Sequence, residues 1–420
     1  MSGPLASRPI QYLFLARFVS ATGDKMFAIA LSWWVVADAS IPNRELTLGL
    51  LLAVATLPIA LAGPFLGPLI DRVNKRSCLV VADLGRCVLA CALAYVIHQG
   101  LLTVPVLFGL CIPLFALTPL FDSAASASLS PLSNGPQMLS QLVALESAIP
   151  NLASTLGALF GSGAIALWGV EGAFWFNAGS FLVSLVFVAR LPPLAARRGD
   201  AQSPLHETGY GFLRRYPDTV LLMALFGLIN FFVAPIFLYL PLLTRDVLNG
   251  GGFELSLLEL AFALGNLLLF AFFAAWPSTF VRTRWLRFGL VLASAGIMWF
   301  LAEARTLGML FMLLLIWGVL VAFVSYLALS AFQRCIPDAF KGRFFALLGS
   351  VCTLAVPLSF ALFGILSGRV GLQELIYGNA AGAALVSVAF LLVGNDPPEG
   401  ISDSSSASRD AGTDRQDQPL

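Results

Sequence analysis

Long apolar runs alternate with short polar turns along most of the chain. Allowing for uncertain ends, each run approaches the roughly 20 residues that a helix needs to cross about 30 Å of hydrocarbon. The pattern therefore predicts an all-α membrane protein with twelve transmembrane helices. The predicted spans are Tyr12–Val36, Leu48–Leu69, Leu79–Ile97, Val104–Phe121, Leu142–Trp168, Phe174–Ala189, Val220–Leu243, Leu257–Trp276, Leu286–Leu301, Met309–Ala331, Phe344–Leu366 and Ile376–Val393.

A polar segment rich in Pro, Arg, Ser and Gly divides the runs into two sets of six. Landmarks of the two sets lie 206 positions apart, because the same shift carries Pro131 to Pro337 and Phe14 to Val220. Such an offset indicates a duplicated chain. We expect two parallel six-helix bundles, an arrangement that recurs in secondary transporters. The predicted divisions are a first bundle over 1–190, a middle loop over 191–217, a second bundle over 218–394 and a disordered polar tail over 395–420.

Composition agrees with a membrane environment and excludes several other classes. Hydrophobic residues make up 58% of the chain and charged residues 11%, against about a quarter charged in soluble domains. Basic residues are spread over separate loops, so we expect no nucleic-acid partner. Six cysteines without a CxxC pair and only two histidines predict neither a metal site nor another cofactor. No nucleotide-binding loop, HExxH or Gly-x-Ser-x-Gly motif is present, which argues against an enzyme.

The distribution of Lys and Arg predicts the orientation in the membrane. Twelve spans put both termini on one side, and that side carries 17 Lys and Arg residues in its loops and tails. The other side carries Arg44, Arg245, Arg305 and Arg369. Because basic loops remain inside the cell, the termini and the middle loop are expected in the cytoplasm.

A charged turn separates the second run from the third, with the pattern Gly67-x-x-x-Asp71-Arg72-x-x-Lys75-Arg76. It must lie at a membrane face, because so many polar groups cannot enter hydrocarbon without partners. Asp71 could accept bonds from nearby arginines and hold this face shut as a gate. Alternatively, the basic residues only anchor the loop and set the topology.

Ionisable residues inside the spans are the strongest candidates for function. Each costs on the order of 3 kcal/mol or more at the bilayer centre unless it is paired or hydrated. Asp24 lies near the middle of the first run, Arg17 is two turns earlier on the same face, and Lys25 points about 100° away. A carboxylate beside a movable cation suits proton coupling or substrate contact. The alternative is a permanent structural ion pair between helices.

Further polar residues in the spans extend this list of candidates. Asp83 and Arg86 are three positions apart and close enough to pair, either structurally or as a link to Asp71 and its basic neighbours. Lone polar residues more often bond to neighbouring helices than line a cavity. The candidates in other runs are Asp122, Glu146, Asn230, Tyr239, Glu259, Tyr326 and Gln333.

The charged turn and the duplicated layout resemble the major facilitator superfamily. Shorter motifs resemble its drug-proton antiporter branch, which includes macrolide efflux proteins and siderophore exporters. They are Gly23-Asp24, Asp83-Leu84-Gly85-Arg86, the segment from Gly211 to Pro217, Pro337-Asp338 and Lys341-Gly342-Arg343. The resemblance implies the major facilitator fold, in which helices five and eight face each other across the two halves. Glu146 and Glu259 would then lie near the cavity.

Two departures from the family pattern stand out. Asn74 replaces the usual glycine of the turn, and asparagine also enters the left-handed region readily. The antiporter pattern Gly-Pro-x-x-Gly-Gly appears as Gly157-Ala158-Leu159-Phe160-Gly161-Ser162. Loss of its proline predicts a straighter fifth helix and weakens the inference of antiport.

The resemblance implies an alternating-access efflux transporter of the multidrug-resistance type, with proton antiport as the driving reaction. A Phe-rich cavity with few polar groups would suit a hydrophobic or amphipathic drug, a macrolide-like compound or a siderophore. We expect Asp24, Arg17, Lys25, Glu146, Glu259 and Asn230 in the cavity, and Gly67, Asp71, Arg72, Lys75, Arg76, Asp83 and Arg86 at the cytoplasmic gate. The expected partners are a small-molecule substrate, protons and membrane lipids, around a monomer in a bacterial inner membrane. Lipid or lysolipid translocation and a scaffold role remain the alternatives.

Overall fold

The computed structural model describes residues 7–194, 217–275, 284–336 and 338–393, and within these ranges the side chains of 62–72, 136, 162, 274, 338–343 and 346 are left undescribed. These ranges form twelve α-helices and one short 3₁₀ helix. The helices are α1 Arg8–Ala37, α2 Arg44–Arg72, α3 Lys75–His98, α4 Val104–Leu132, α5 Pro136–Val188, α7 Pro217–Val233, α8 Ile236–Asp246, α9 Gly252–Ala275, α10 Arg284–Glu303, α11 Leu307–Cys335, α12 Asp338–Ser367, α13 Leu372–Ala389 and η1 Phe390–Leu392.

The helices follow the predicted spans with two differences. The fifth and sixth spans are both part of α5, which is interrupted between them at Gly169, whose φ of 68° lies in the left-handed region that glycine tolerates. The seventh span is broken between α7 and α8, next to Pro235, which lacks the amide hydrogen that a continuing helix needs. Finally, α4 continues past Phe121 to Leu132, and in this part Asp122 lies beside Arg17 of α1 and Ser126 bonds to Glu146 of α5.

Eleven stretches of the described residues are long and apolar enough to cross a membrane. Two of these stretches lie within α5, and one joins α7 and α8. Helix α1 is not among them although it has 30 residues, because Arg17, Asp24 and Lys25 lower its hydropathy. The charged residues that single out α1 as a site candidate are therefore also what makes it the least typical span.

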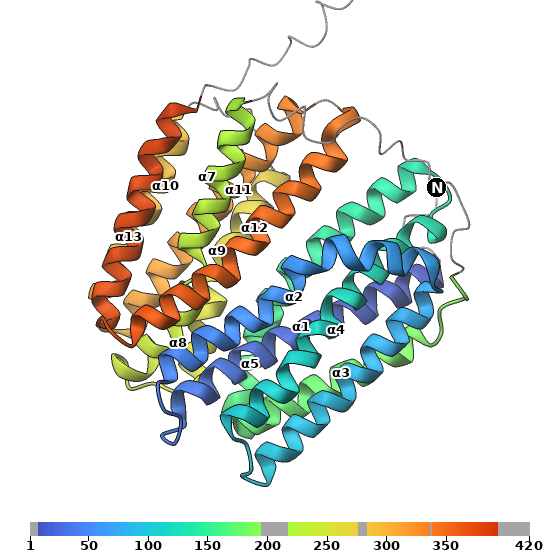
Figure 1. The fold of residues 1–420 in the computed structure, drawn as a ribbon, viewed down its shortest axis with the longest axis horizontal. Coiled ribbons are helices and arrows are strands. Elements are labelled where there is room, and N and C mark those ends of the chain that lie inside the picture. The colour runs from blue at the N-terminus through green and yellow to red at the C-terminus, as the bar shows by residue number, and fades with distance from the viewer. Residues whose placement is uncertain (1–6, 195–216, 276–283, 337, 394–420) are drawn as a thin grey trace, which may run out of the picture.

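The helices form two groups, α1 to α5 and α7 to α13, which converge at one end of the molecule (Figure 1). That end holds the turn at 38–43 and the contact of Gly49 with Gly364, and we call it the Gly49 end. The other end, where α1 begins and α2 turns into α3, is called the N-terminal end. The predicted boundaries at 190/191 and 217/218 stay predictions, and most of the middle loop and the tail lie outside the described residues.

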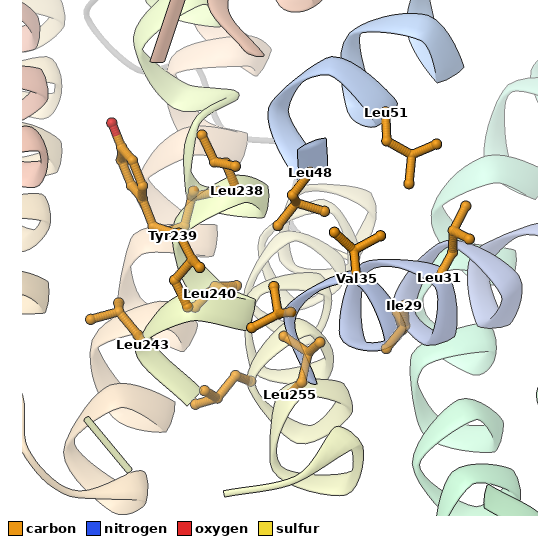
Figure 2. Close-up of a cluster of buried hydrophobic side chains, with 14 of the residues drawn as sticks. Ile29, Leu31, Val35, Leu48, Leu51, Leu238, Tyr239, Leu240, Leu243 and Leu255 are labelled. Carbon is orange, nitrogen blue, oxygen red and sulfur yellow. The ribbon is translucent and has the colours of Figure 1, made fainter. Parts of the chain in front are cut away.

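Packing of the buried apolar residues explains why the groups meet at one end. At the Gly49 end a single core joins both groups, with Val35 and Leu48 against Leu240 and Leu255 (Figure 2). Toward the N-terminal end the described core residues separate into different clusters. One contains only residues from α1 to α5 and the segment after it, and the others only residues from α7 to Val393.

A glycine pair brings the two groups into backbone contact at the Gly49 end. A Cβ added to Gly49 on α2 would lie 2.6 Å from the Cα of Gly364 on α12 and 2.8 Å from the carbonyl oxygen of Phe360. Since both neighbours are backbone atoms, no side-chain movement could make room. This close crossing depends on two residues that lack a Cβ.

Candidate functional site

Arg86 on α3 is the centre of a buried charge cluster in the first group of helices. Its Nη2 lies 2.5 Å from Oδ1 of Asp83, and Ser184 on α5 donates a hydrogen bond of 2.6 Å to Oδ2 of the same carboxylate. The guanidinium carbon lies 4.5 Å from the ring centroids of both Phe121 and Phe181. Asp83 and Arg86 therefore pair, as their spacing predicts, and aromatic stacking fixes the cation.

Asp24 is the second carboxylate on this arginine. Its Oδ2 lies 3.4 Å from Nη1 of Arg86, and its side chain is 30% exposed while that of Asp83 is fully buried. Asp24 is thus the looser and more accessible of the two acids. The expectation that Arg17 is the cation beside Asp24 is wrong, because the cation is Arg86, contributed by α3 rather than by α1.

Arg17 is bonded instead in a second cluster nearer the N-terminal end. It forms an ion pair with Glu146 on α5, and its Nη2 lies 3.7 Å from Oδ1 of Asp122 on α4. Ser126 donates a hydrogen bond to the carboxylate of Glu146. In each cluster two carboxylates contact one guanidinium, so each has a surplus acid that could take up a proton without leaving an unpaired cation.

Lys25 and Glu259 form an ion pair that connects the two groups of helices. Lys25 extends from α1 to the carboxylate of Glu259 on α9, which is only 5% exposed. The Lys25 Nζ also lies 5.1 Å from the ring centroid of Phe237 on α8. Gly157 on α5 makes room for the stem of the lysine, because a Cβ there would lie 2.7 Å from Cβ of Lys25.

This ion pair borders a cavity of about 130 Å³ between the two groups. Sequence reasoning anticipated Lys25 and Glu259 but missed the amides and the hydroxyl beside them. Asn151 and Ser154 are three positions apart on α5, and Glu259 and Asn266 are seven apart on α9, so each pair shares a helix face. This spacing could have indicated that Asn151, Ser154 and Asn266 belong to the same polar site as Glu259. The cavity is lined by Lys25, Asn151, Ser154, Phe237, Glu259, Phe262, Ala263 and Asn266.

Asn230 was expected in the cavity, but its described contact is local. Its Nδ2 donates a hydrogen bond of 2.8 Å to the carbonyl oxygen of Phe226 in its own helix. It does not belong to the residues that line the cavity beside Lys25. Within the described ranges no group of three or more His, Cys, Asp or Glu residues could hold a metal ion.

The charged turn can be followed only in part. Gly67, Asp71 and Arg72 belong to the last turns of α2, and their side chains lie outside the described part of the chain. The backbone amide of Lys75 donates a hydrogen bond to the carbonyl oxygen of Leu194. Nη2 of Arg76 donates a hydrogen bond of 2.6 Å to the carbonyl oxygen of Ala189. These contacts tie the start of α3 to the segment that follows α5. The gate role of the turn stays a prediction.

Asn74 does not adopt the left-handed conformation that the departure from the family pattern suggested. Its φ is −63° and its ψ 118°, and it caps α3. Its Oδ1 accepts a hydrogen bond of 3.0 Å from the amide of Arg76. Asparagine is favoured here as a helix N-cap, so the substitution is explained by capping rather than by backbone freedom.

The sequence of this chain is similar to a known protein family and to known proteins. The sequence pattern of the Major Facilitator Superfamily matches residues 13–359. Macrolide efflux protein A of Streptococcus pyogenes is 24% identical over 334 residues, which cover 76% of this chain and 80% of that protein. Macrolide efflux protein A of Enterococcus faecalis is 24% identical over 324 residues, covering 72% of this chain and 95% of the relative.

Solved structures show the same fold at low sequence identity. A D-xylose-proton symporter superposes with a TM-score of 0.72 at 14% identity, covering 92% of this chain and 98% of the symporter. This likeness confirms the predicted all-α membrane fold and says nothing about the substrate. The family consists of transporters, in agreement with the expectation that the chain is not an enzyme. The chain belongs to the Major Facilitator Superfamily.

Proposed function

We propose that this chain is a secondary transporter of a bacterial inner membrane that exports hydrophobic or amphipathic small molecules in exchange for protons. The observation that carries the proposal is Asp24, a partly exposed carboxylate in the middle of α1 that shares Arg86 with a fully buried acid. The names of the macrolide efflux relatives support export. The excess of Lys and Arg on the side of the termini supports their cytoplasmic location.

Proton coupling follows from the two unequal bonds of Arg86. When Asp24 takes up a proton, Arg86 keeps its shorter bond to Asp83, so no buried cation is left without a partner. When Asp24 releases the proton, the cluster regains a surplus negative charge. This change in charge occurs on α1, the helix that also carries Lys25 to the second group.

The packing supports alternating access. The two groups share a core at the Gly49 end and have separate cores toward the N-terminal end, so this conformation corresponds to a transporter closed outside and open inside. We take the groups as two six-helix halves, 1–190 and 218–394, that rock about the region around Lys25. The turn from Gly67 to Arg76 would close the cytoplasmic end after rocking.

The lining of the cavity supports an amphipathic cargo. Phe237 and Phe262 supply aromatic surface, while Lys25, Glu259, the Ser154 hydroxyl and two asparagine amides supply polar contacts. An aromatic or aliphatic body with a polar head would match both kinds of surface.

Everted membrane vesicles that contain the chain test the proposal. We expect a proton gradient to drive uptake of a labelled macrolide, and addition of the macrolide to collapse part of the gradient reported by an acridine dye. Asp24→Asn should reduce both signals to the level of vesicles without the protein, because the proton site of the Arg86 cluster, which we propose drives transport, is gone. Asp246→Asn, which alters an acid paired with Arg245 at 3.5 Å on α8, is the control.

The opposite results would separate the alternatives. Full proton-driven uptake by a folded Asp24→Asn variant would remove Asp24 from the mechanism. Uptake that persists without a pH gradient and is competed by lysolipids would favour lipid translocation over antiport.

A further inference from the structure

The cavity between the halves contains one full positive and one full negative charge at its wall. We propose that it recognises the polar head of the transported molecule and selects heads that carry both an ammonium-type and a carboxylate-type group. The inference rests on the proposed function, because it names the class of substrate for the same site.

Both charges of the cavity are largely removed from solvent. The side chains of Lys25 and Glu259 are 19% and 5% exposed, and each is the other's charged partner. Burial of an unpaired ion costs several kcal/mol, and breaking a buried pair by removing one partner is strongly destabilising. A ligand that separates the two residues must therefore replace the partner of each.

Charge balance then distinguishes the classes of ligand. A cationic head can pair with Glu259 but leaves Lys25 with the ring of Phe237, which replaces only part of an ion pair. An anionic head pairs with Lys25 and leaves Glu259 buried without a cation. A head with both charges satisfies both residues and keeps the site neutral. Specificity would come from the penalty on the wrong ligands as much as from the contacts with the right one.

The size of the cavity indicates that only the head of the ligand enters. Its volume is about 130 Å³. Drug-sized ligands occupy pockets of roughly 300 Å³ or more. The amides of Asn151 and Asn266 can bind further polar atoms of the head, while the apolar body would extend between the halves.

Binding to the purified full chain in lipid nanodiscs tests the inference without requiring transport. The probes are naphthylalanine, which carries both charges, naphthylethylamine, which carries the cation alone, and naphthylpropanoate, which carries the anion alone. They share one apolar body. Equilibrium dialysis should show naphthylalanine binding at least about tenfold tighter than either singly charged probe.

Single substitutions should invert this preference. Glu259→Gln leaves a positive site and should favour naphthylpropanoate, while Lys25→Gln leaves a negative site and should favour naphthylethylamine. The double variant Lys25→Gln/Glu259→Gln has no unpaired buried charge, so it should fold and should bind the three probes within about threefold of one another. Glu171→Gln, which alters an exposed acid bonded to His98 at 2.8 Å, is the matched control and should keep the wild-type order.

Two results would overturn the inference: the same order of affinities in the wild-type, single and double variants, or no binding of any probe by the wild-type chain. The proposed function fails separately, because a chain that shows the predicted charge preference but moves neither a macrolide nor naphthylalanine against a proton gradient is not the proposed exporter. A chain that transports but binds the three probes without regard to their charge would support the proposed function and contradict the inference.

Discussion

Asp24 and Asp83 show how one guanidinium can hold two carboxylates of different character. Asp83 is fully buried and receives hydrogen bonds from both Arg86 and Ser184, whereas Asp24 is partly exposed and lies 3.4 Å from the arginine. The strongly bonded acid keeps Arg86 in place between two phenylalanine rings. The loosely bonded acid is then available for protonation. The two acids should therefore differ in what their loss does to the protein.

Asp83→Asn should lower the free energy of unfolding by about 3 kcal/mol, because it removes the buried carboxylate that makes the shorter bond to Arg86. Asp24→Asn should lower it by less than about 1 kcal/mol, since Arg86 retains Asp83. Thermal or denaturant unfolding of both purified variants in detergent checks the difference. Equal destabilisation by the two substitutions would show that Asp24 is a structural partner of Arg86 and no better suited to protonation than Asp83.

At the residue scale the sequence predicted which ionisable groups lie in the helices better than it predicted which groups they pair with. The cost of burying a charge drew attention to Asp24, Arg17, Lys25 and Glu259 without any structure. The pair of Asp83 and Arg86 could be read from helical spacing. The contacts of Arg86 with Asp24 and of Lys25 with Glu259 could not, because they depend on how separate helices pack and not on local periodicity.

Helix α1 contributes a residue to each charge cluster, Asp24 to one and Arg17 to the other. It also carries Lys25, which pairs with Glu259 in the second group of helices. Its position is set by close packing on α5, where Gly157 faces Cβ of Lys25 and the carbonyl oxygen of Thr22. The kink at Gly169 and the break at Pro235 also follow from glycine and proline chemistry, although hydropathy alone left the run from Val220 to Leu243 continuous.

Gly157→Ala should impair transport without abolishing folding. The new Cβ would lie 2.7 Å from Cβ of Lys25 and 2.8 Å from the Thr22 carbonyl oxygen, so α1 must shift and carry Lys25 away from Glu259. We expect roughly a tenfold loss of proton-driven macrolide uptake in everted vesicles. Gly163→Ala, on the same helix with no atom within 4 Å of its added Cβ, is the control and should transport normally. Equal uptake by the two variants would mean that the α1–α5 contact does not position Lys25.

The whole molecule is joined at one end and divided at the other. The duplicated pattern of the sequence predicted two sets of helices, and the membrane fold follows from hydrophobic run lengths. Which end is joined could not be predicted, because the same residues must form every conformation of an alternating-access cycle and the pattern of apolar positions is common to all of them. The contact of Gly49 with Gly364 identifies the joined end only once coordinates are known.

Distances across the two ends test alternating access most directly. Spin labels at Ser40 and Arg369 span the Gly49 end, and labels at Asn134 and Gln333 span the N-terminal end, after replacement of the six native cysteines. All four positions are exposed. Double electron–electron resonance on the labelled chain in nanodiscs then measures both distances under the same conditions.

We expect two populations of molecules, in which the distance at one end is short when the distance at the other end is long. Asp24→Asn, which mimics the protonated acid, should change the ratio of these populations by about fivefold or more, because the proton site and the conformation are coupled. One fixed distance at each end, unchanged by pH and by Asp24→Asn, would contradict the account.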